Sequence, residues 1–227
     1  MAESLVFNCD CVSAMREMPD KCFDVGFADF PYGNDTNYDV FVDTRENLVA
    51  LINDVMPELL RVCDRVAITP GVSNMYLYPA PDWVMCWYSP AGIGSSKWGF
   101  CCWQPILIYG DDPYLKNLLG RRPDSFSWGK NDNDLTNEFH PCPKPIKVME
   151  IILNRMCIGN EKVIDPFCGS GTTRIAAHNL GLDFTGYEIS PTYHALQEKR
   201  FQQHISQPKL FSPSELTHTK IEQKKIF

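Results

Sequence analysis

A glycine-containing loop between an apolar segment and a helix-like segment constrains the fold of this chain more than any other feature. The loop, residues 165–173, follows the apolar residues 162–164 and leads into a segment with helical character at 172–180. A second apolar segment, 184–187, ends at Glu188. Glycines here let a ligand approach the backbone at the carboxyl end of a parallel strand, and a carboxylate at the tip of the next strand can bind the two hydroxyls of a ribose. The pattern predicts a nucleoside-binding α/β domain.

The residues of the loop favour a nucleoside that carries an amino acid over a nucleoside triphosphate. A phosphate-binding loop requires a lysine before its Ser or Thr, and Gly171-Thr172-Thr173 has none. Asp165 at the loop entrance would repel phosphates but suits an ammonium group. A glycine turn that only packs tightly is the alternative interpretation, and the nine-residue string together with Glu188 argues against it.

Apolar strands and amphipathic helices alternate along the rest of the chain. Further strands are expected at 5–8, 24–28, 65–69, 83–88 and 105–109, and further helices at 12–18, 46–63, 146–157 and 191–204. Residues 89–97 are expected to be a linker, and 110–139 are polar without periodicity. The alternation predicts a mostly parallel sheet with helices on both faces. We expect one catalytic domain, 1–204, followed by a flexible tail, 205–227.

The composition narrows the compartment and the partners. Ten cysteines are scattered without a Cys-x-x-Cys pair, which predicts reduced thiols and no metal site. No apolar run approaches the roughly 20 residues of a membrane span, and no secretory signal is apparent, so we expect a cytoplasmic protein. The net charge is −7, with 5 basic against 14 acidic residues in 1–96, 7 against 6 in 97–147 and 9 against 8 in 148–227. A nucleic acid would therefore meet the middle and late parts of the chain.

The tetrapeptide Asp29-Phe30-Pro31-Tyr32 follows the apolar segment 24–28. This segment resembles the catalytic tetrapeptide of amino-type DNA methyltransferases, whose substrate is an amino group conjugated to a nucleobase. Such an amino group is a poor nucleophile, because its lone pair is delocalised into the ring. Asp29 and the backbone carbonyl of Phe30 can each accept one amino hydrogen, which moves the nitrogen toward sp3 geometry. Tyr32 can stack on the base, and Pro31 stiffens the turn. Such a base must leave the duplex before its amino group can be reached.

Together, the glycine loop and the tetrapeptide resemble the motifs of amino-type DNA methyltransferases, and the resemblance extends over most of the chain. The family pattern is Asp/Asn/Ser-Pro-Pro-Tyr/Phe, from which Phe30 departs, although any residue supplies the carbonyl. The tetrapeptide precedes the loop, as in the β class, whereas glutamine methyltransferases and many RNA adenine enzymes have the reverse order. The resemblance implies a circularly permuted Rossmann-like fold with a seven-stranded sheet, a small recognition insertion and S-adenosyl-L-methionine as cofactor.

The resemblance also assigns roles to individual residues. Asp10 would accept from the adenine amino group of the cofactor, Cys11 would offer a backbone contact, and Lys144 would bind the cofactor carboxylate. Cys9 stands where the family usually has Gly. The implied catalytic residues are Asp29, Phe30, Pro31 and Tyr32, and the implied cofactor-binding residues are Asp10, Cys11, Lys144, Asp165, Phe167, Cys168, Gly169, Ser170, Gly171, Thr172, Thr173, Glu188 and Ile189.

The recognition region is expected within 89–139, which is short and contains basic and aromatic residues. The candidate contacts with phosphates and bases are Lys97, Trp98, Arg121, Arg122 and Lys130. Each of these residues taken alone is also consistent with a solvated surface or a core aromatic. A region of this size suits a short target sequence, a homodimer or a single-stranded substrate, and the sequence leaves the three open.

Two short patterns lie within the expected tail. Gln207-Pro208-Lys209-Leu210-Phe211 and Gln223-Lys224-Lys225-Ile226-Phe227 both fit Gln-x-x-Leu/Ile-Phe. This pattern resembles the peptide by which bacterial proteins dock on the replication sliding clamp, where a Gln and two apolar anchors enter a preformed pocket. A tail without such a partner is the alternative interpretation of so short a pattern.

These motifs predict methyl transfer to an exocyclic amino group of a flipped DNA base. Adenine N6 is favoured, because Asp at the first position of the tetrapeptide is more typical of adenine enzymes and Ser of cytosine N4 enzymes. Methylation of cytosine N4, or of adenine in RNA, is the alternative among enzymes. A catalytically silent cofactor- or DNA-binding protein is the alternative of another class, suggested by Phe30. The expected setting is a bacterial cell, or the host of a phage, with restriction-modification as one of several roles.

Overall fold

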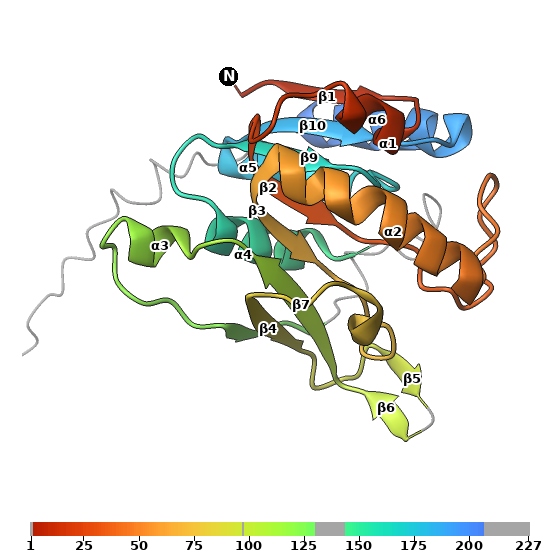
Figure 1. The fold of residues 1–227 in the computed structure, drawn as a ribbon, viewed down its shortest axis with the longest axis horizontal. Helices are drawn as coiled ribbons and strands as arrows, with labels where there is room; N and C mark the ends of the chain where they lie inside the picture. The colour runs from red at the N-terminus through yellow and green to blue at the C-terminus, as the bar shows by residue number, and fades with distance from the viewer. Residues whose placement is uncertain (1, 97, 130–143, 207–227) are drawn as a thin grey trace, which may run out of the picture.

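An eight-stranded mixed sheet runs through the centre of the computed structural model, which describes residues 2–96, 98–129 and 144–206 (Figure 1). In spatial order its strands are β1 (Ser4–Phe7), β10 (Asp183–Tyr187), β9 (Lys162–Asp165), β2 (Phe23–Ala28), β3 (Cys63–Ile68), β7 (Trp103–Tyr109), β4 (Trp83–Tyr88) and β8 (Ser125–Ser127). The first five are mutually parallel, β7 is antiparallel to both of its neighbours, and β8 is parallel to β4. The seven strands expected from the sequence are present, and β8 adds an eighth.

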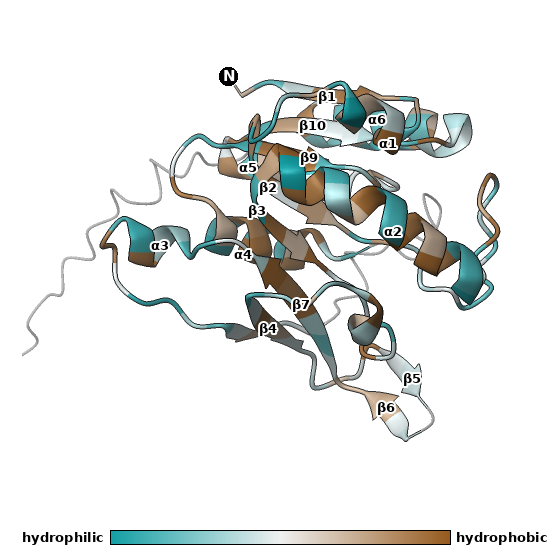
Figure 2. Cartoon of the chain, in the orientation of Figure 1, coloured by the Kyte–Doolittle hydropathy of each residue, from teal (hydrophilic) through white to brown (hydrophobic). Residues whose placement is uncertain are grey.

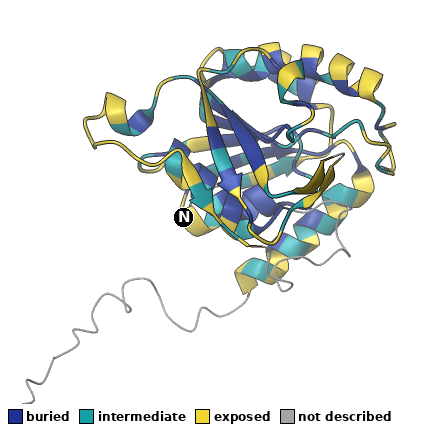
Figure 3. Cartoon of the chain, turned by 90° about the horizontal axis from the view of Figure 1, so that it is seen from below, coloured by how far each residue is buried: buried dark blue, intermediate teal, exposed yellow. Residues whose placement is uncertain are grey.

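Helices cover both faces of this sheet. They are α1 (Cys11–Arg16), α2 (Arg45–Val62), α3 (Pro113–Lys116), α4 (Ile146–Met156), α5 (Thr172–Leu180) and α6 (Pro191–Ser206), with a 3-10 turn, η1, at Met75–Leu77. The buried side chains of α1 and α2 pack on one face, and those of α4 and α5 pack on the other. Phe201 of α6 contacts His178 of α5. Apolar residues at helical spacing account for this layering, which Figures 2 and 3 show as apolar, buried strands between helices with exposed outer faces.

The strand order brings distant parts of the chain together. β9, which leads into the glycine loop, lies between β10 and β2, and β2 leads into the tetrapeptide. Because these three strands are parallel, their carboxyl ends meet at one edge of the sheet. The permuted Rossmann-like topology predicted from the motif order is therefore confirmed in the path of the chain.

The structure corrects the expectation that residues 89–97 form a linker without secondary structure. It contains β5 (Gly94–Ser96), which pairs with β6 (Gly99–Cys101) as an antiparallel hairpin. The linker prediction was wrong because Gly and Ser lack the side chains typical of strands, whereas this pairing depends on the backbone. One such bond runs from the N–H of Ile93 to the carbonyl of Cys101.

The polar segment after β7 also contains more structure than its sequence suggests. Asp112 caps α3 by accepting from the N–H groups of Tyr114 and Leu115, and the short β8 follows. At the other end of the chain, α6 continues to Ser206, two residues into the expected tail. No helix among the described residues is long and apolar enough to cross a bilayer.

Candidate active site

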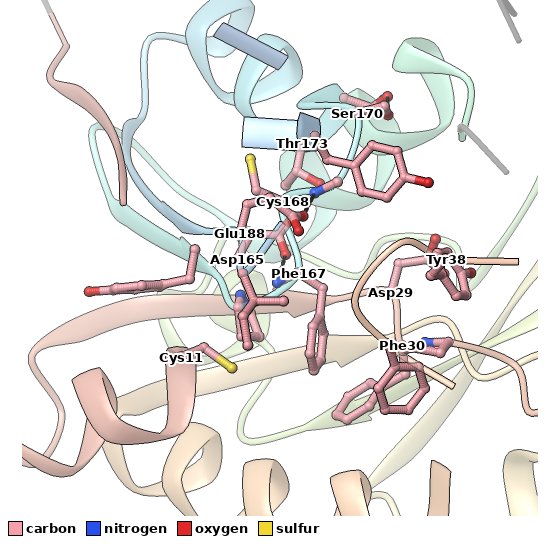
Figure 4. Close-up of a pocket in the computed structure, with 18 of the residues that line it drawn as sticks. Cys11, Asp29, Phe30, Tyr38, Asp165, Phe167, Cys168, Ser170, Thr173 and Glu188 are labelled. Atoms are coloured by element: carbon pink, nitrogen blue, oxygen red, sulfur yellow. Dashed lines mark hydrogen bonds between the residues drawn. The ribbon is translucent and has the colours of Figure 1, made fainter. Parts of the chain in front are cut away.

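A cavity opens at the edge of the sheet where β2, β9 and β10 end (Figure 4). Its walls come from the start of α1, the tetrapeptide and the loop that follows it, the glycine loop, and the turn after β10. All of the predicted catalytic and cofactor-binding residues line this cavity except Gly171. The fold therefore gathers in one place residues that the sequence only suggested separately.

The glycine loop turns tightly between β9 and α5. Gly169 and Gly171 have φ angles of 47° and 74°, a left-handed conformation that other residues rarely adopt. A Cβ at Gly171 would lie 3.1 Å from Cβ of Gln197 in α6, so Gly171 serves packing rather than the cavity wall. The guanidinium of Arg200 donates to the carbonyl of Ser170 and to the Thr172 hydroxyl, at 2.8 and 2.9 Å. This contact fixes the loop against α6.

Glu188 lies just beyond β10, as predicted, and is largely buried. One carboxylate oxygen accepts from the N–H of Gly169 at 2.9 Å, and the other accepts from the N–H of Ser190 at 2.8 Å. Burial raises the pKa of Glu188, and these two backbone bonds oppose the rise. Since a carboxylate has about four lone-pair sites, it can still accept from the hydroxyls of a bound ribose.

Asp165 ends β9 and is buried at the floor of the loop. Burial raises the pKa of this carboxyl to about 7, while hydrogen bonds from the Thr173 hydroxyl and the Phe167 N–H lower it. The charge of Asp165 is therefore sensitive to pH near neutrality. A cationic ligand group would favour the ionised form.

The remaining predicted cofactor contacts border the same cavity. Asp10 caps α1 by accepting from the Ser13 N–H at 2.7 Å, Cys11 is buried, and Ile189 is exposed. Sequence reasoning missed the segment 38–41, which also lines the cavity. It lies in a polar loop whose sequence carries no motif. Only the tertiary structure shows that this segment borders the cavity.

Asp29 is the centre of a hydrogen-bond cluster beyond the end of β2. Its Oδ1 accepts from the hydroxyls of Tyr32 and Thr69, at 2.8 and 2.6 Å. Its Oδ2 accepts from Nζ of Lys144 at 2.5 Å, and the same nitrogen lies 2.6 Å from the Tyr32 hydroxyl oxygen. Gln104 of β7 donates its amide N–H to that hydroxyl oxygen at 3.1 Å. Both carboxylate oxygens of Asp29 therefore bind donors, one of which is Nζ of Lys144.

Phe30 has a structural reason to depart from the family pattern. Its ring is buried, and it packs against Phe167 of the glycine loop and Tyr78, with centroid distances of 4.6 and 5.3 Å. Asn74 donates to the carbonyl of Tyr32 at 2.7 Å, which supports the turn from outside the motif. Thr69, Asn74 and Gln104 were not found by sequence reasoning, because nothing local in the chain links them to the tetrapeptide.

The predicted DNA contacts do not gather at one place. Trp98 is almost fully exposed in the β5–β6 hairpin, and residues of this hairpin share a second cavity with Tyr32. Arg122 stacks on the ring of Tyr114 at 4.7 Å, and the Tyr114 hydroxyl donates to the carbonyl of Asn154 near the end of α4. Since β7 runs antiparallel to β3, the segment with Arg121 and Arg122 starts from the opposite edge of the sheet (Figure 1). The structure does not bring these two arginines to the edge of the sheet where the cavity opens.

Several of the predicted contact residues lie outside the described residues: Lys97, Lys130 and both pentapeptides of the tail. Within the part of the chain that is described, no three His, Cys, Asp or Glu side chains are grouped to hold a metal ion. The described cysteines are all free thiols.

The fold and the cavity define the class of protein. It is an α/β protein in which a glycine loop suited to a nucleoside cofactor lies beside the tetrapeptide that contains Asp29. Residues 82–199, just over half of the chain, match a family model described as DNA methylase, N6_N4_Mtase. The chain belongs to this DNA methylase family. The resemblance inferred from the motifs is thereby confirmed.

Two relatives illustrate the family. The Type II methyltransferase M.BamHI of Bacillus amyloliquefaciens is 24% identical over 81% of this chain and 54% of its own length. The DNA adenine methyltransferase YhdJ of Escherichia coli K12 is 23% identical over 83% of this chain and 79% of its own length. The chain thus spans about half of M.BamHI and most of YhdJ.

Two solved structures share the fold. The PvuII DNA methyltransferase, described as cytosine-N4-specific, superposes with a TM-score of 0.66 at 13% identity, covering 96% of this chain and 91% of that one. TTHA0409 of Thermus thermophilus, in complex with S-adenosyl-L-methionine, has a TM-score of 0.61 at 18% identity, covering 91% and 95%. Because both identities are low, the likeness concerns the fold alone, and it confirms the predicted fold class.

Proposed function

We propose that this protein transfers a methyl group from S-adenosyl-L-methionine to an exocyclic amino group of a base in DNA. One observation supports this above all: Asp29 and the glycine loop line the same cavity. The carboxylate that would accept an amino hydrogen is therefore next to the loop that would hold the methyl donor. Membership of the DNA methylase family supports DNA as the substrate.

The residues present fit each part of the proposed cofactor. Glu188 would accept from the ribose hydroxyls, and the buried carboxyl of Asp165 would pair with the ammonium of the methionine part. Lys144 is the one basic side chain among the described residues of the cavity, so it would bind the carboxylate. Asp10 would accept from the adenine amino group. Charge and hydrogen-bond type thus match along the length of the ligand.

In the proposed reaction, the target amino nitrogen takes the place that Nζ of Lys144 has beside Asp29. Asp29 would accept one amino hydrogen and the Phe30 carbonyl the other, which directs the nitrogen lone pair into the cofactor cavity. When bound, the cofactor supplies a methyl group on a sulfonium sulfur, and the nitrogen–carbon bond forms as the carbon–sulfur bond breaks. The methylated nitrogen then releases a proton to solvent water. No covalent bond to the protein is needed.

Within this reaction, adenine N6 is the target that we propose. Asp at the first position of the tetrapeptide supports it, as does the adenine activity named for the relative YhdJ. Cytosine N4 is the second candidate, because the PvuII enzyme of similar fold is described as specific for it.

Mass spectrometry of nucleosides tests the proposal directly. DNA and RNA are incubated separately with the protein and S-adenosyl-L-methionine, and N6-methyladenine is expected in DNA. N4-methylcytosine alone would move the assignment to the second candidate. A methylated base found only in RNA would contradict the proposed substrate.

The alternative of a silent binding protein needs its own control. Asp29→Ala should lower methylation by about 10²-fold or more while the cofactor still binds, as measured by calorimetry. A wild-type protein that binds cofactor and DNA but leaves every nucleoside unmethylated would support the silent alternative.

A homodimer and docking on a sliding clamp stay predictions. Measurement of the molecular mass in solution tests the homodimer, and titration of a 205–227 peptide with a bacterial clamp tests the docking.

A further inference from the structure

A second cavity lies on the other side of Tyr32 and Lys144, the two described residues that line both cavities. Its walls include aromatic and apolar side chains from β4, β7 and the segment before β5, among them Trp87, Ile93 and Trp103. Gln104 of β7 brings a primary amide into this apolar wall and is only 6% exposed. The second cavity thus combines flat apolar surfaces, suited to a ring, with one buried amide.

Hydrogen bonding fixes which end of the Gln104 amide faces Tyr32. The single hydroxyl proton of Tyr32 is donated to Oδ1 of Asp29. The hydroxyl oxygen can therefore only accept from Gln104, which requires Nε2 on that side, where it lies 3.1 Å away. Oε1 is on the other side, buried and without a hydrogen-bond partner among the described residues. The polarity of the amide is thus set by the catalytic carboxylate through Tyr32.

A base whose amino group reaches Asp29 presents the rest of its Watson–Crick edge in a fixed order. The next atom is a ring nitrogen that accepts a hydrogen bond, N1 in adenine and N3 in cytosine. The position after it differs, because adenine has a C2–H group and cytosine has the acceptor O2. Nε2 of Gln104 has a second hydrogen for the ring nitrogen, whereas Oε1 tolerates a C–H group but repels a second acceptor.

We propose that Gln104 is a specificity-determining residue that favours adenine over cytosine in this way. The inference rests on the proposed amino-methyl transfer and deepens it by naming a residue that chooses the base. Rotating the amide would remove the repulsion from O2 of cytosine. It would also set Oε1 against the Tyr32 hydroxyl oxygen, two acceptors without a proton between them, so the rotated state is disfavoured.

The experiment compares kcat/KM for two duplexes that carry adenine or cytosine at the target position. Methylation mapping of DNA modified by the wild-type protein supplies the surrounding sequence. The wild type is expected to prefer adenine. Gln104→Met, which keeps the side-chain length but removes both the amide N–H donor and the amide oxygen acceptor, is expected to reduce the preference by on the order of 10- to 100-fold, with cofactor affinity unchanged. A wild type that prefers cytosine, or a full adenine preference in Gln104→Met, overturns the inference.

Two matched variants separate base selection from damage to the cluster. Thr69→Val removes another hydrogen bond to Asp29 without touching the amide, so it should slow methylation of both duplexes equally and keep the ratio. Tyr32→Phe removes the hydroxyl that orients the amide, so the preference should fall. In the double variant of Tyr32→Phe and Gln104→Met, the adenine-to-cytosine ratio of kcat/KM should then differ little from that of Tyr32→Phe alone.

If Gln104→Met does not fold, Thr69→Val and Tyr32→Phe test the same role of the amide. A preference retained in Tyr32→Phe, or lost equally in Thr69→Val, contradicts the role of the oriented amide. N4-methylcytosine as the wild-type product overturns this inference alone, whereas no methylated base in any nucleic acid overturns the proposed function with it.

Discussion

Two halves of the cavity are built in different ways: the proposed cofactor half, around the glycine loop and Glu188, and the proposed catalytic half, around Asp29. In the cofactor half, the two carboxylates accept from backbone N–H groups at most 19 residues away: Glu188 from Ser190 and Gly169, and Asp165 from Phe167. In the catalytic half, Asp29 is held by Thr69 and Lys144, which are 40 and 115 residues away in the sequence. A short stretch of chain therefore encodes much of the cofactor site, whereas the catalytic cluster exists only when the sheet has assembled.

We therefore expect cofactor binding and methyl transfer to depend on different halves of the cavity. A change at Glu188 or Asp165 should act on cofactor affinity, because the hydrogen bonds of these two carboxylates go to backbone groups and Thr173 rather than to the Asp29 cluster. A change at Asp29, Thr69 or Gln104 should act on turnover and base choice. Lys144 belongs to both halves, because it contacts Asp29 and is also proposed to bind the cofactor carboxylate. Substitutions in each half therefore test whether the two functions are separate.

Asp29→Ala should give the largest effect. Loss of the acceptor that activates the amino nitrogen is expected to lower kcat by about 10²- to 10³-fold or more, while the Kd of the cofactor stays nearly constant. Incorporation of labelled methyl groups and calorimetry measure the two quantities. Asp54→Ala, at an exposed position of α2, is the matched control and should keep full activity. Near-normal turnover in Asp29→Ala would refute the assignment of the catalytic half.

Glu188→Ala should act mainly on the other half. Removing the acceptor for the ribose hydroxyls is expected to weaken cofactor binding by about 10- to 100-fold, because hydrogen bonds to charged groups are among the stronger ones. At saturating cofactor, the preference between adenine and cytosine duplexes should be that of the wild type. A changed base preference would break the proposed separation between the halves.

The raised pKa of Asp165, about 7, predicts a pH dependence confined to the cofactor half. Below that pKa the carboxyl is protonated and loses its attraction for an ammonium group, so cofactor affinity should fall about tenfold between about pH 8 and pH 6. Because the folded pKa lies above the unfolded value, the carboxyl favours folding at low pH, and its contribution is lost as the pH rises through about 7. Asp165→Asn should flatten both profiles, measured by calorimetry and by denaturant unfolding. An unchanged profile in that variant would assign the dependence to another group.

The smallest effects are expected outside both halves. Arg122→Ala should change the KM for DNA by less than about twofold, because the side chain is at the edge of the sheet far from Asp29 and is solvent-exposed. Trp98→Ala, in the hairpin that adjoins the second cavity, should raise this KM by about tenfold if the ring stacks on a base. Steady-state kinetics on the mapped DNA site compare the two. The reverse order of effects would place the DNA on the opposite edge.

The fold was largely predictable because its signals are periodic and local. Seven strands and the five longer helices follow from apolar spacing, and the expected helix at 172–180 has the bounds observed for α5. The β5–β6 hairpin and β8 were not predictable, since Gly and Ser residues in strands depend on pairing rather than on side-chain preference.

By itself, the sequence determined the glycine loop, the carboxylates at Asp165 and Glu188 and the tetrapeptide, together with the order of these motifs. Each is a contiguous string whose chemistry can be recognised without coordinates. Only the tertiary structure brought Thr69, Gln104 and Lys144 to Asp29, and only it left the two arginines at the other edge. The physical reason is that hydrogen bonds between distant strands depend on sheet order and register, which are set by the packing of the whole domain rather than by any local pattern.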